Sequence, residues 1–152
     1  METQYVRNHI CSLVPHAKPF RYIGDITYLD AERITGTYYL SQAEPFYAGH
    51  FPNYPVTPGV ILTEVMAQIG MVAFGIYLLT LEGEKSFANM VTLLTDVQIK
   101  YKQEVMPNTK VVVHSQKLLF RHGRLKCNVT LYNEQQQVCC IASMSGMVAI
   151  RK

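Results

Sequence analysis

The pattern of apolar and polar positions predicts a strand-rich chain. Residues 20–40 alternate as two strands around a turn near 30–32, and the second strand, 33–40, is rich in β-branched and aromatic residues. Four later stretches have the same character, and short polar turns separate the last three: 86–101, 110–121, 124–132 and 138–150. Residues 1–19 are mixed, and their two prolines exclude a long helix there.

One segment predicts a long helix. Thr57 is a suitable N-cap, and Pro58 fits the first helical position, where its missing N–H costs nothing. The helix should run from about Pro58 to about Leu79, and it is apolar on nearly every face. One glutamine and two glycines interrupt the apolar run 65–81, which favours burial in protein over a membrane span. We therefore expect the sheet to wrap around this helix.

The order of these elements predicts an α+β fold in a single domain, 1–152. Strands, one long helix and then more strands are typical of that class, and 152 residues suffice for one sizeable core. Apolar residues make up 49% of the chain and charged residues 16%, which is low in charge for a monomer with a fully wetted surface. We therefore expect a homo-oligomer in which an uncovered face or edge of the sheet meets a second copy.

Charge is placed unevenly along the chain. Residues 97–152 hold nine of the fourteen Lys and Arg residues but only two of the eleven acids, Glu104 and Glu134. A basic flank attracts acidic partners, although a solvated face of alternating strands explains the same pattern. The sequence has no resemblance to a nucleic-acid-binding module.

The cysteine pattern indicates reduced thiols. The chain contains neither a CxxC nor the spacings typical of metal ligands, so we expect no metal. A signal-peptide pattern is not evident at the N-terminus, which favours a cytoplasmic protein. Adjacent cysteines on a strand point to opposite faces. We interpret all four as reduced and mostly buried: Cys11, Cys127, Cys139 and Cys140.

The proline-rich loop 41–57 carries the first residue with candidate chemistry, His50. Gly49 permits close backbone approach, and Phe51 and Pro52 fix the direction in which the chain leaves the histidine. A neutral imidazole there suits a general base near pH 7, and a purely structural histidine is the alternative. The other histidines are interpreted as structural: His9, His16, His114 and His122.

Glu64 is the second candidate, because a carboxyl group inside an apolar helix is costly to bury unless it is paired or functional. Desolvation favours the protonated form, which suits a general acid. Gln68, one helical turn later, could orient Glu64 or a water molecule. A half-exposed glutamate at a helix edge is the alternative.

The helix start is the third candidate. The N–H groups of Gly59 and Val60 lie in the first turn and lack intrahelical partners, and Pro58 cannot donate. Together with the helix dipole they can stabilise an oxyanion on a carbonyl. A base, an acid and an oxyanion site describe proton abstraction beside a carbonyl with loss of a β-hydroxyl, which is dehydration of a 3-hydroxyacyl thioester.

These residues also resemble a known signature. Gly49-His50-Phe51-Pro52, with Pro55–Val60 and Glu64–Gln68, is similar to the central motif of the 3-hydroxyacyl-acyl carrier protein dehydratases of bacterial type II fatty-acid synthesis. The resemblance covers most of the chain and includes further segments: 14–16, 19–20, 44–46, 95–101 and 105–108.

The resemblance implies a hot-dog fold, a curved antiparallel sheet around one long helix. It implies a homodimer, often a trimer of dimers, with each active site built from both subunits. His50 of one protomer would remove the C2 proton, Glu64 of the other would protonate the departing hydroxyl, and the Gly59 N–H would bind the thioester carbonyl. The substrate would arrive on the phosphopantetheine of an acidic acyl carrier protein, without a metal or redox cofactor.

Three positions depart from the family pattern. Asn53-Tyr54 replaces a glycine and a charged residue, and Thr57 replaces an apolar residue, commonly Met. These differences suit a secondary pathway, such as polyene or aryl-polyene assembly, by analogy alone.

Two other functions remain open from the sequence. One is a hot-dog acyl thioesterase in which Glu64 activates water. The other is a non-catalytic hot-dog subunit that binds acyl chains. In the leading hypothesis, acyl chain length depends on tunnel depth, set by side chains such as Met71, Phe74 and Phe87.

Overall fold

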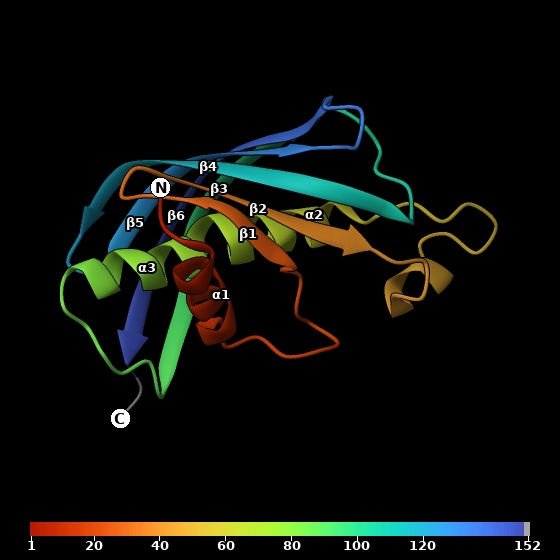
Figure 1. Cartoon of the computed structure of the whole chain (residues 1–152). Coiled ribbons are helices and arrows are strands. Elements are labelled where there is room, and N and C mark those ends of the chain that lie inside the picture. The colour runs from red at the N-terminus through yellow and green to blue at the C-terminus, as the bar shows by residue number, and fades with distance from the viewer. Residues whose placement is uncertain (151–152) are drawn as a thin grey trace.

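In the computed structural model, which describes residues 1–150, a curved antiparallel sheet wraps around a long central helix (Figure 1). An N-terminal helix precedes the first two strands, and the remaining strands follow the central helix. The elements outside the central helix are α1 (Gln4–Leu13), β1 (Asp25–Leu29), β2 (Arg33–Leu40), the 3-10 turn η1 (Pro45–Ala48), β3 (Met90–Tyr101), β4 (Thr109–Arg121), β5 (Arg124–Tyr132) and β6 (Val138–Ile150). The predicted α+β class and hot-dog arrangement are confirmed.

The central helix is continuous from Gly59 to Leu81 but contains one wide turn. It consists of α2 (Gly59–Ala67), the π-helical turn η2 (Gln68–Ala73) and α3 (Phe74–Leu81). At Gly70, a Cβ atom would lie 3.1 Å from side-chain atoms of Ser115 and Val129, so glycine lets the helix approach the sheet closely. The Ser115 hydroxyl donates to the Gly70 carbonyl at 3.0 Å. π-helical turns inside α-helices, such as η2, occur often at functional sites.

The sheet has the strand order β1-β2-β4-β5-β6-β3, so β1 and β3 form its two edges. Helix α1 packs against β1, whereas β3 is a twelve-residue edge strand that pairs on one side with β6. The β4–β5 hairpin turns through His122 and Gly123, both with positive φ (53° and 75°), as a two-residue primed turn requires. A long exposed edge of this kind is suited to pairing with another strand.

The core lies between the inner face of the sheet and the helix. Alternate side chains of β5 point inward, as the period of two of a strand requires. Helix residues meet them from nearly every side, which explains why the helix lacks a polar face. Fully buried side chains from helix and sheet form this core: Met66, Ile69, Phe74, Ile76, Ile34, Leu131 and Met144. The long apolar helix Gly59–Leu81 is thus largely buried inside the protein.

Most predicted elements are confirmed in their bounds. The strands predicted at 33–40, 124–132 and 138–150 occur as predicted, and the strand predicted at 86–101 begins at Met90. Helix α1 was not predicted. Its signal is local: the Thr3 hydroxyl caps it by accepting from the Val6 N–H at 3.2 Å, and Ile10 is buried against the core.

The predicted cap of the central helix is wrong. Pro58, with ψ near 138°, is the N-cap, and no side chain among residues 1–150 makes a capping hydrogen bond to this helix. Thr57 is instead buried and held elsewhere, because its hydroxyl pairs with the Tyr47 hydroxyl at 2.5 Å and its N–H donates to the Val105 carbonyl at 2.9 Å. Tertiary contacts therefore keep Thr57 extended, as is also favoured before a proline, and the helix begins one residue later than predicted.

Candidate active site

His50 sits half-buried in the loop before the central helix. Its Nδ1 lies 2.9 Å from the Val56 carbonyl. A carbonyl can only accept, so Nδ1 carries a proton, and in the neutral form of the ring the free lone pair is on Nε2. The Val56 N–H donates back to the His50 carbonyl at 2.9 Å. The loop thus fixes both the tautomer and the position of the ring.

The residues after His50 form a tight turn. The N–H of Phe51 donates to the Tyr54 carbonyl and the N–H of Tyr54 donates to the Phe51 carbonyl, each at 3.0 Å. The Phe51 ring stacks on His50 with centroids 4.5 Å apart, and the Tyr54 hydroxyl donates to the Glu104 carboxylate at 2.6 Å. Tyr54, one of the departures from the family pattern, thereby ties the loop to the segment after β3.

The role predicted for Gly49 is wrong. A Cβ atom at Gly49 would have no neighbour within 4 Å, and the backbone there is right-handed helical with φ near −104°. Glycine is therefore not required for close approach at this position. The orientation of His50 comes from its hydrogen bonds with Val56 instead.

The start of the central helix presents two free donors. The first helical hydrogen bonds run from the N–H groups of Ile61 and Leu62 to the Pro58 carbonyl, at 3.0 and 3.1 Å. Within the described chain, the N–H groups of Gly59 and Val60 have no hydrogen-bond partner. This is the arrangement that stabilises negative charge on an oxygen.

A tyrosine ring packs over this helix start. The Tyr101 hydroxyl pairs with the Thr63 hydroxyl at 2.6 Å, and a Cβ at Gly59 would lie only 3.0 Å from the Tyr101 ring. Gly59 and Tyr101 line the same surface hollow as His50. The imidazole and the helix start therefore face one space.

Glu64 lies in a different hollow, one and a half turns into the helix. Its side chain is 22% exposed, and its Oε1 accepts a hydrogen bond from Gln68 Nε2 at 3.0 Å. The hollow continues along the helix past Met71 to Gly75 and is closed on the other side by β3, β5 and β6.

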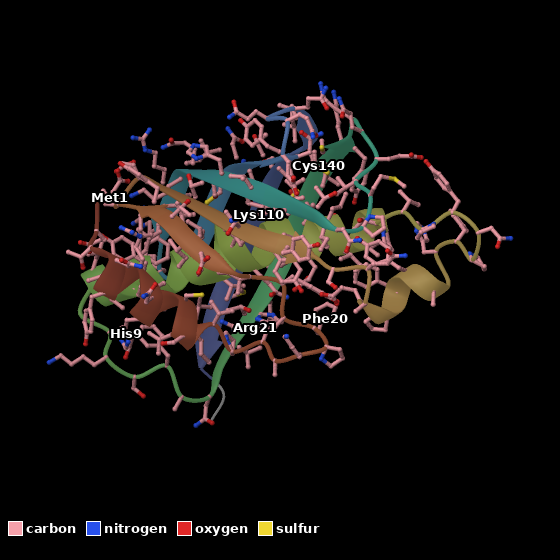
Figure 2. All side chains as sticks on the ribbon, turned by 45° about the vertical axis from the view of Figure 1, so that its right-hand side comes forward. Met1, His9, Phe20, Arg21, Lys110 and Cys140 are labelled. Carbon is pink, nitrogen blue, oxygen red and sulfur yellow. The ribbon has the colours of Figure 1, made fainter. Side chains whose placement is uncertain are left out.

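Gln68 fixes Glu64 to the N-terminal segment. Gln68 is fully buried; its Oε1 accepts from the Tyr22 N–H at 2.6 Å, and its Nε2 donates to the Phe20 carbonyl at 3.0 Å. Figure 2 shows Phe20 and Arg21 on the loop between α1 and β1. All polar atoms of the amide are thus used, which makes Gln68 a rigid support for the carboxylate.

His16 belongs to the same hollow, although sequence reasoning assigned it a structural role. Its Nε2 lies 3.7 Å from Glu64 Oε1, and its Nδ1 is buried without a hydrogen-bond partner in the described chain. Burial lowers the pKa of His16, and the opposing effect of Glu64 does not overcome this. The position of His16 in the family-like segment 14–16 was the signal available for finding it.

One protomer does not bring His50 and Glu64 together. Each lines its own hollow, and no hydrogen bond or ion pair joins them among residues 1–150. His50, Gly59 and Val60 form one group and Glu64, Gln68 and His16 form another. Each hollow holds half of the predicted chemistry.

The cysteines and acids form no metal site in the part of the chain that the structure describes. No three His, Cys, Asp or Glu residues there are grouped suitably for a metal ion. The four cysteines are free, and burial raises the pKa of Cys127 to about 11 and that of Cys140 to about 12. Cys139 and Cys140 are both fully buried although they are adjacent on β6.

Comparison with known proteins identifies the family. The family model of the FabA-like domain matches residues 14–142. The chain is 35% identical over 114 residues to the 3-hydroxyacyl-[acyl-carrier-protein] dehydratase FabZ of Staphylococcus epidermidis, covering 74% of each chain. It is 33% identical over 144 residues to FabZ of Petrotoga mobilis, covering 94% of this chain and 96% of the relative. The chain belongs to the FabA-like dehydratases.

Solved structures support the fold of this FabA-like protein. The dehydratase heterocomplex ApeI:P from Xenorhabdus doucetiae matches with a TM-score of 0.79 at 12% identity, over 93% of this chain and 91% of the other. A thioesterase from Haemophilus influenzae matches with a TM-score of 0.65 at 14% identity, over 99% and 92%. At these identities the likeness concerns the fold. The activity class, a hydro-lyase, follows from the closer sequence relatives.

Proposed function

We propose that the protein dehydrates 3-hydroxyacyl thioesters carried on acyl carrier protein to trans-2-enoyl thioesters, in fatty-acid biosynthesis or a related acyl pathway. One observation supports this proposal most directly. The His50 imidazole, with Nε2 free, lines the same hollow as the helix start, where the N–H groups of Gly59 and Val60 have no partner among the described residues. The same helix carries Glu64. Family membership supports the reaction, and the geometry supports the roles.

In the proposed mechanism, His50 Nε2 removes the C2 proton and charge develops on the thioester oxygen. The Gly59 N–H, with Val60 beside it, stabilises that charge. Glu64, in its protonated form, donates a proton to the C3 hydroxyl, the C3–O bond breaks, and water leaves as the C2=C3 double bond forms. Gln68 keeps the carboxyl aimed, Pro58 leaves the donor positions free, and Phe51 and Pro52 support the histidine loop.

The sheet edge explains how two half-sites can become one. Leu93 and Leu94 of β3 are 51% and 41% exposed and border the Glu64 hollow. Tyr101, at the other end of β3, borders the His50 hollow. If two β3 edges pair antiparallel across a two-fold axis, the Tyr101 end of one strand comes beside the Leu93–Leu94 end of its partner.

Such pairing would bring His50 of one protomer toward Glu64 of its partner. We therefore propose a homodimer with two shared active sites, and a trimer of such dimers as the larger assembly. Figure 1 shows β3 beside β6 with its other side uncovered. Burial of the exposed leucines would supply the hydrophobic part of the association.

The remaining parts of the proposal follow from the same site. Lys102 and Glu104 both line the His50 hollow. The nine basic and two acidic residues of 97–152 would attract the acidic carrier protein that delivers the phosphopantetheine arm. The proposed residues need no metal or redox cofactor for this chemistry. We further propose that residues 1–152 form one hot-dog domain and that the enzyme acts in the cytoplasm.

The deciding experiment compares wild type with His50→Ala and Glu64→Gln on a 3-hydroxyacyl thioester of acyl carrier protein. Absorbance of the enoyl thioester measures water loss, and free thiol is followed in parallel. We expect enoyl formation by wild type and a loss of about a hundredfold or more in kcat/KM for each folded variant. Near-wild-type turnover by either folded variant would contradict the mechanism, and thiol release without enoyl product would indicate a thioesterase.

A further inference from the structure

The hollow at Glu64 has the form of a channel along one face of the central helix. Its volume is about 110 Å³. Glu64 lies near its start, and Ala67, Met71 and Gly75 follow at helical spacing along its wall. Apart from Glu64, His16 and Thr92, the residues that line it are of apolar types, and backbone groups supply further polar surface. An acyl tail can therefore extend from the reacting carbons at Glu64 toward Gly75.

The far end of this channel is narrow. A Cβ placed on Gly75 would lie 3.8 Å from Val148 Cγ2 and 3.9 Å from Leu125 Cδ2. Those are ordinary contact distances, so the position of the missing Gly75 side chain is space between the helix and these two residues. A methyl group would fill it without a clash.

A second hollow lies beyond this end. Its volume is about 90 Å³, and four apolar residues and two polar ones border it: Leu79, Phe87, Met90, Val148, Glu84 and Ser86. Val148 is the residue that borders both hollows. Its side chain therefore stands between the channel from Glu64 and additional apolar space.

The side chains expected to set tunnel depth have different positions. Met71 borders the first hollow and Phe87 the second. Phe74 is fully buried in the core and borders neither of them. Phe74 therefore does not line the channel, unlike Met71.

We propose that Gly75 and Val148 together end the acyl channel and set the longest chain that the enzyme accepts; this rests on the proposed dehydratase function. Gly75 is eleven positions after Glu64, a helical rise of about 16 Å. An extended hydrocarbon follows a zigzag and advances about 1.3 Å per bond, so about twelve carbons beyond C3 span that distance. Acyl chains of up to about fifteen carbons in total would then fit between Glu64 and Gly75.

Two substitutions should act in opposite directions. Val148→Ala removes the side chain between the channel and the second hollow, so kcat/KM for longer acyl chains should rise. Gly75→Ala adds a methyl group at the narrow end, so kcat/KM for long acyl chains should fall while kcat/KM for the shortest chains is unchanged. Val111→Ala is the matched control, since Val111 is fully buried on β4 and borders neither hollow.

The test measures kcat/KM for 3-hydroxyacyl thioesters of graded length, together with the Kd of non-hydrolysable alkyl-pantetheine thioethers of the same lengths. For Val148→Ala we expect the ratio of long-chain to short-chain kcat/KM to rise about tenfold or more, and for Gly75→Ala to fall by a similar factor. The Val111→Ala protein should keep the wild-type profile. Circular dichroism checks that each variant is folded.

The binding series separates two kinds of failure. If wild type dehydrates none of the substrates but the Kd profile still shifts in opposite directions, the reaction is wrong and the channel end is right. If the length profiles of Val148→Ala and Gly75→Ala match that of wild type, the inference is overturned whatever the activity. A shift of equal size in Val111→Ala would also overturn it, because core loosening would then explain the result.

Discussion

His16 Nε2 lies 3.7 Å from Glu64 Oε1, the same oxygen that accepts a hydrogen bond from Gln68 at 3.0 Å. A separation of 3.7 Å is too long for a hydrogen bond, so the histidine would pair with the carboxylate only by carrying charge. Burial lowers the pKa of His16 and opposes that charge. Glu64, the proposed acid, is therefore held by the neutral amide of Gln68 and lies beside the neutral imidazole of His16.

Because His16 is neutral in the folded protein, we expect the free energy of unfolding to depend on pH. Burial also lowers the pKa of His114, so both rings bind protons more readily in the unfolded chain, where the histidine pKa is about 6.5. The unfolded state then takes up more protons as the pH falls through 6.5, and the free energy of unfolding decreases. Above that pH both rings are neutral in both states, and this contribution to the slope vanishes.

Urea unfolding at pH 7.5 and pH 5.5 measures this effect at fixed protein concentration. We expect the loss of stability on acidification to be smaller in His16→Gln than in wild type, and smaller still when His114→Gln is added. Equal losses in all three proteins would show that these rings do not cause the dependence.

A second prediction concerns Gln68. Gln68→Leu removes the hydrogen bonds to Tyr22, Phe20 and Glu64 and leaves the Tyr22 N–H buried without a partner. We expect the free energy of unfolding to fall by about 3 kcal/mol and kcat/KM to fall as well, because the Glu64 carboxyl loses its support. Ser115→Ala, which loses one buried hydrogen bond to Gly70, should cost about 1 kcal/mol.

Denaturant unfolding and turnover should be measured on the same preparations. A Gln68→Leu protein as stable as Ser115→Ala would mean that the Tyr22 N–H finds another partner. Stability loss with unchanged kcat/KM would mean that Glu64 does not depend on Gln68 for its orientation.

The parts of the fold and site that the sequence predicted are those that depend on local spacing. The periods of strands and helix are properties of neighbouring residues, and so is the i, i+4 relation of Glu64 and Gln68 that places both on one helix face. The two free donors at Gly59 and Val60 also follow from their place in the first turn. For these features no knowledge of distant residues was needed.

The errors have the opposite character. Thr57 is kept from capping the helix by Tyr47 and Val105, and Val105 is far away in sequence. The contact of His16 with Glu64 joins residues that are also distant along the chain. Tertiary contacts of this kind override local preference, and a single sequence does not reveal them.

A third prediction contrasts two glycines near the proposed oxyanion site. Gly59→Ala places a Cβ 3.0 Å from the Tyr101 ring, which must shift; we expect a clear loss of kcat/KM with little change in unfolding free energy. Gly49→Ala adds a Cβ with no neighbour within 4 Å, and we expect activity near that of wild type. Comparison of the two variants tests whether turnover depends on the packing around the Gly59 N–H. If replacing any glycine in this region reduced turnover, both variants would lose activity.

Steady-state kinetics and thermal unfolding of both variants provide the readout. A large loss of activity in Gly49→Ala would show that glycine is required at this position, and it would contradict the conclusion that the hydrogen bonds with Val56 orient His50. Full activity in Gly59→Ala would show that the Tyr101 ring moves freely away from the helix start.

The last prediction tests whether one active site draws on two protomers. A His50→Ala homodimer lacks the base in both sites, and a Glu64→Gln homodimer lacks the acid in both. If each site combines His50 of one protomer with Glu64 of its partner, a mixed dimer has one complete site and one site that lacks both groups. Statistical reassociation of equal amounts makes half of the dimers mixed, so about a quarter of the wild-type activity should return.

The two inactive variants are mixed, dissociated in mild denaturant and returned to buffer, with each variant treated alone as the control. Recovery toward a quarter of the wild-type rate requires sharing across the interface. If both residues of a site came from the same chain, each mixed dimer would carry two defective sites and no activity would return. A variant of the β3 edge, Leu93→Lys with Leu94→Lys, should abolish both dimerisation and recovery, because it places charge on the leucines that border the Glu64 hollow at the exposed edge.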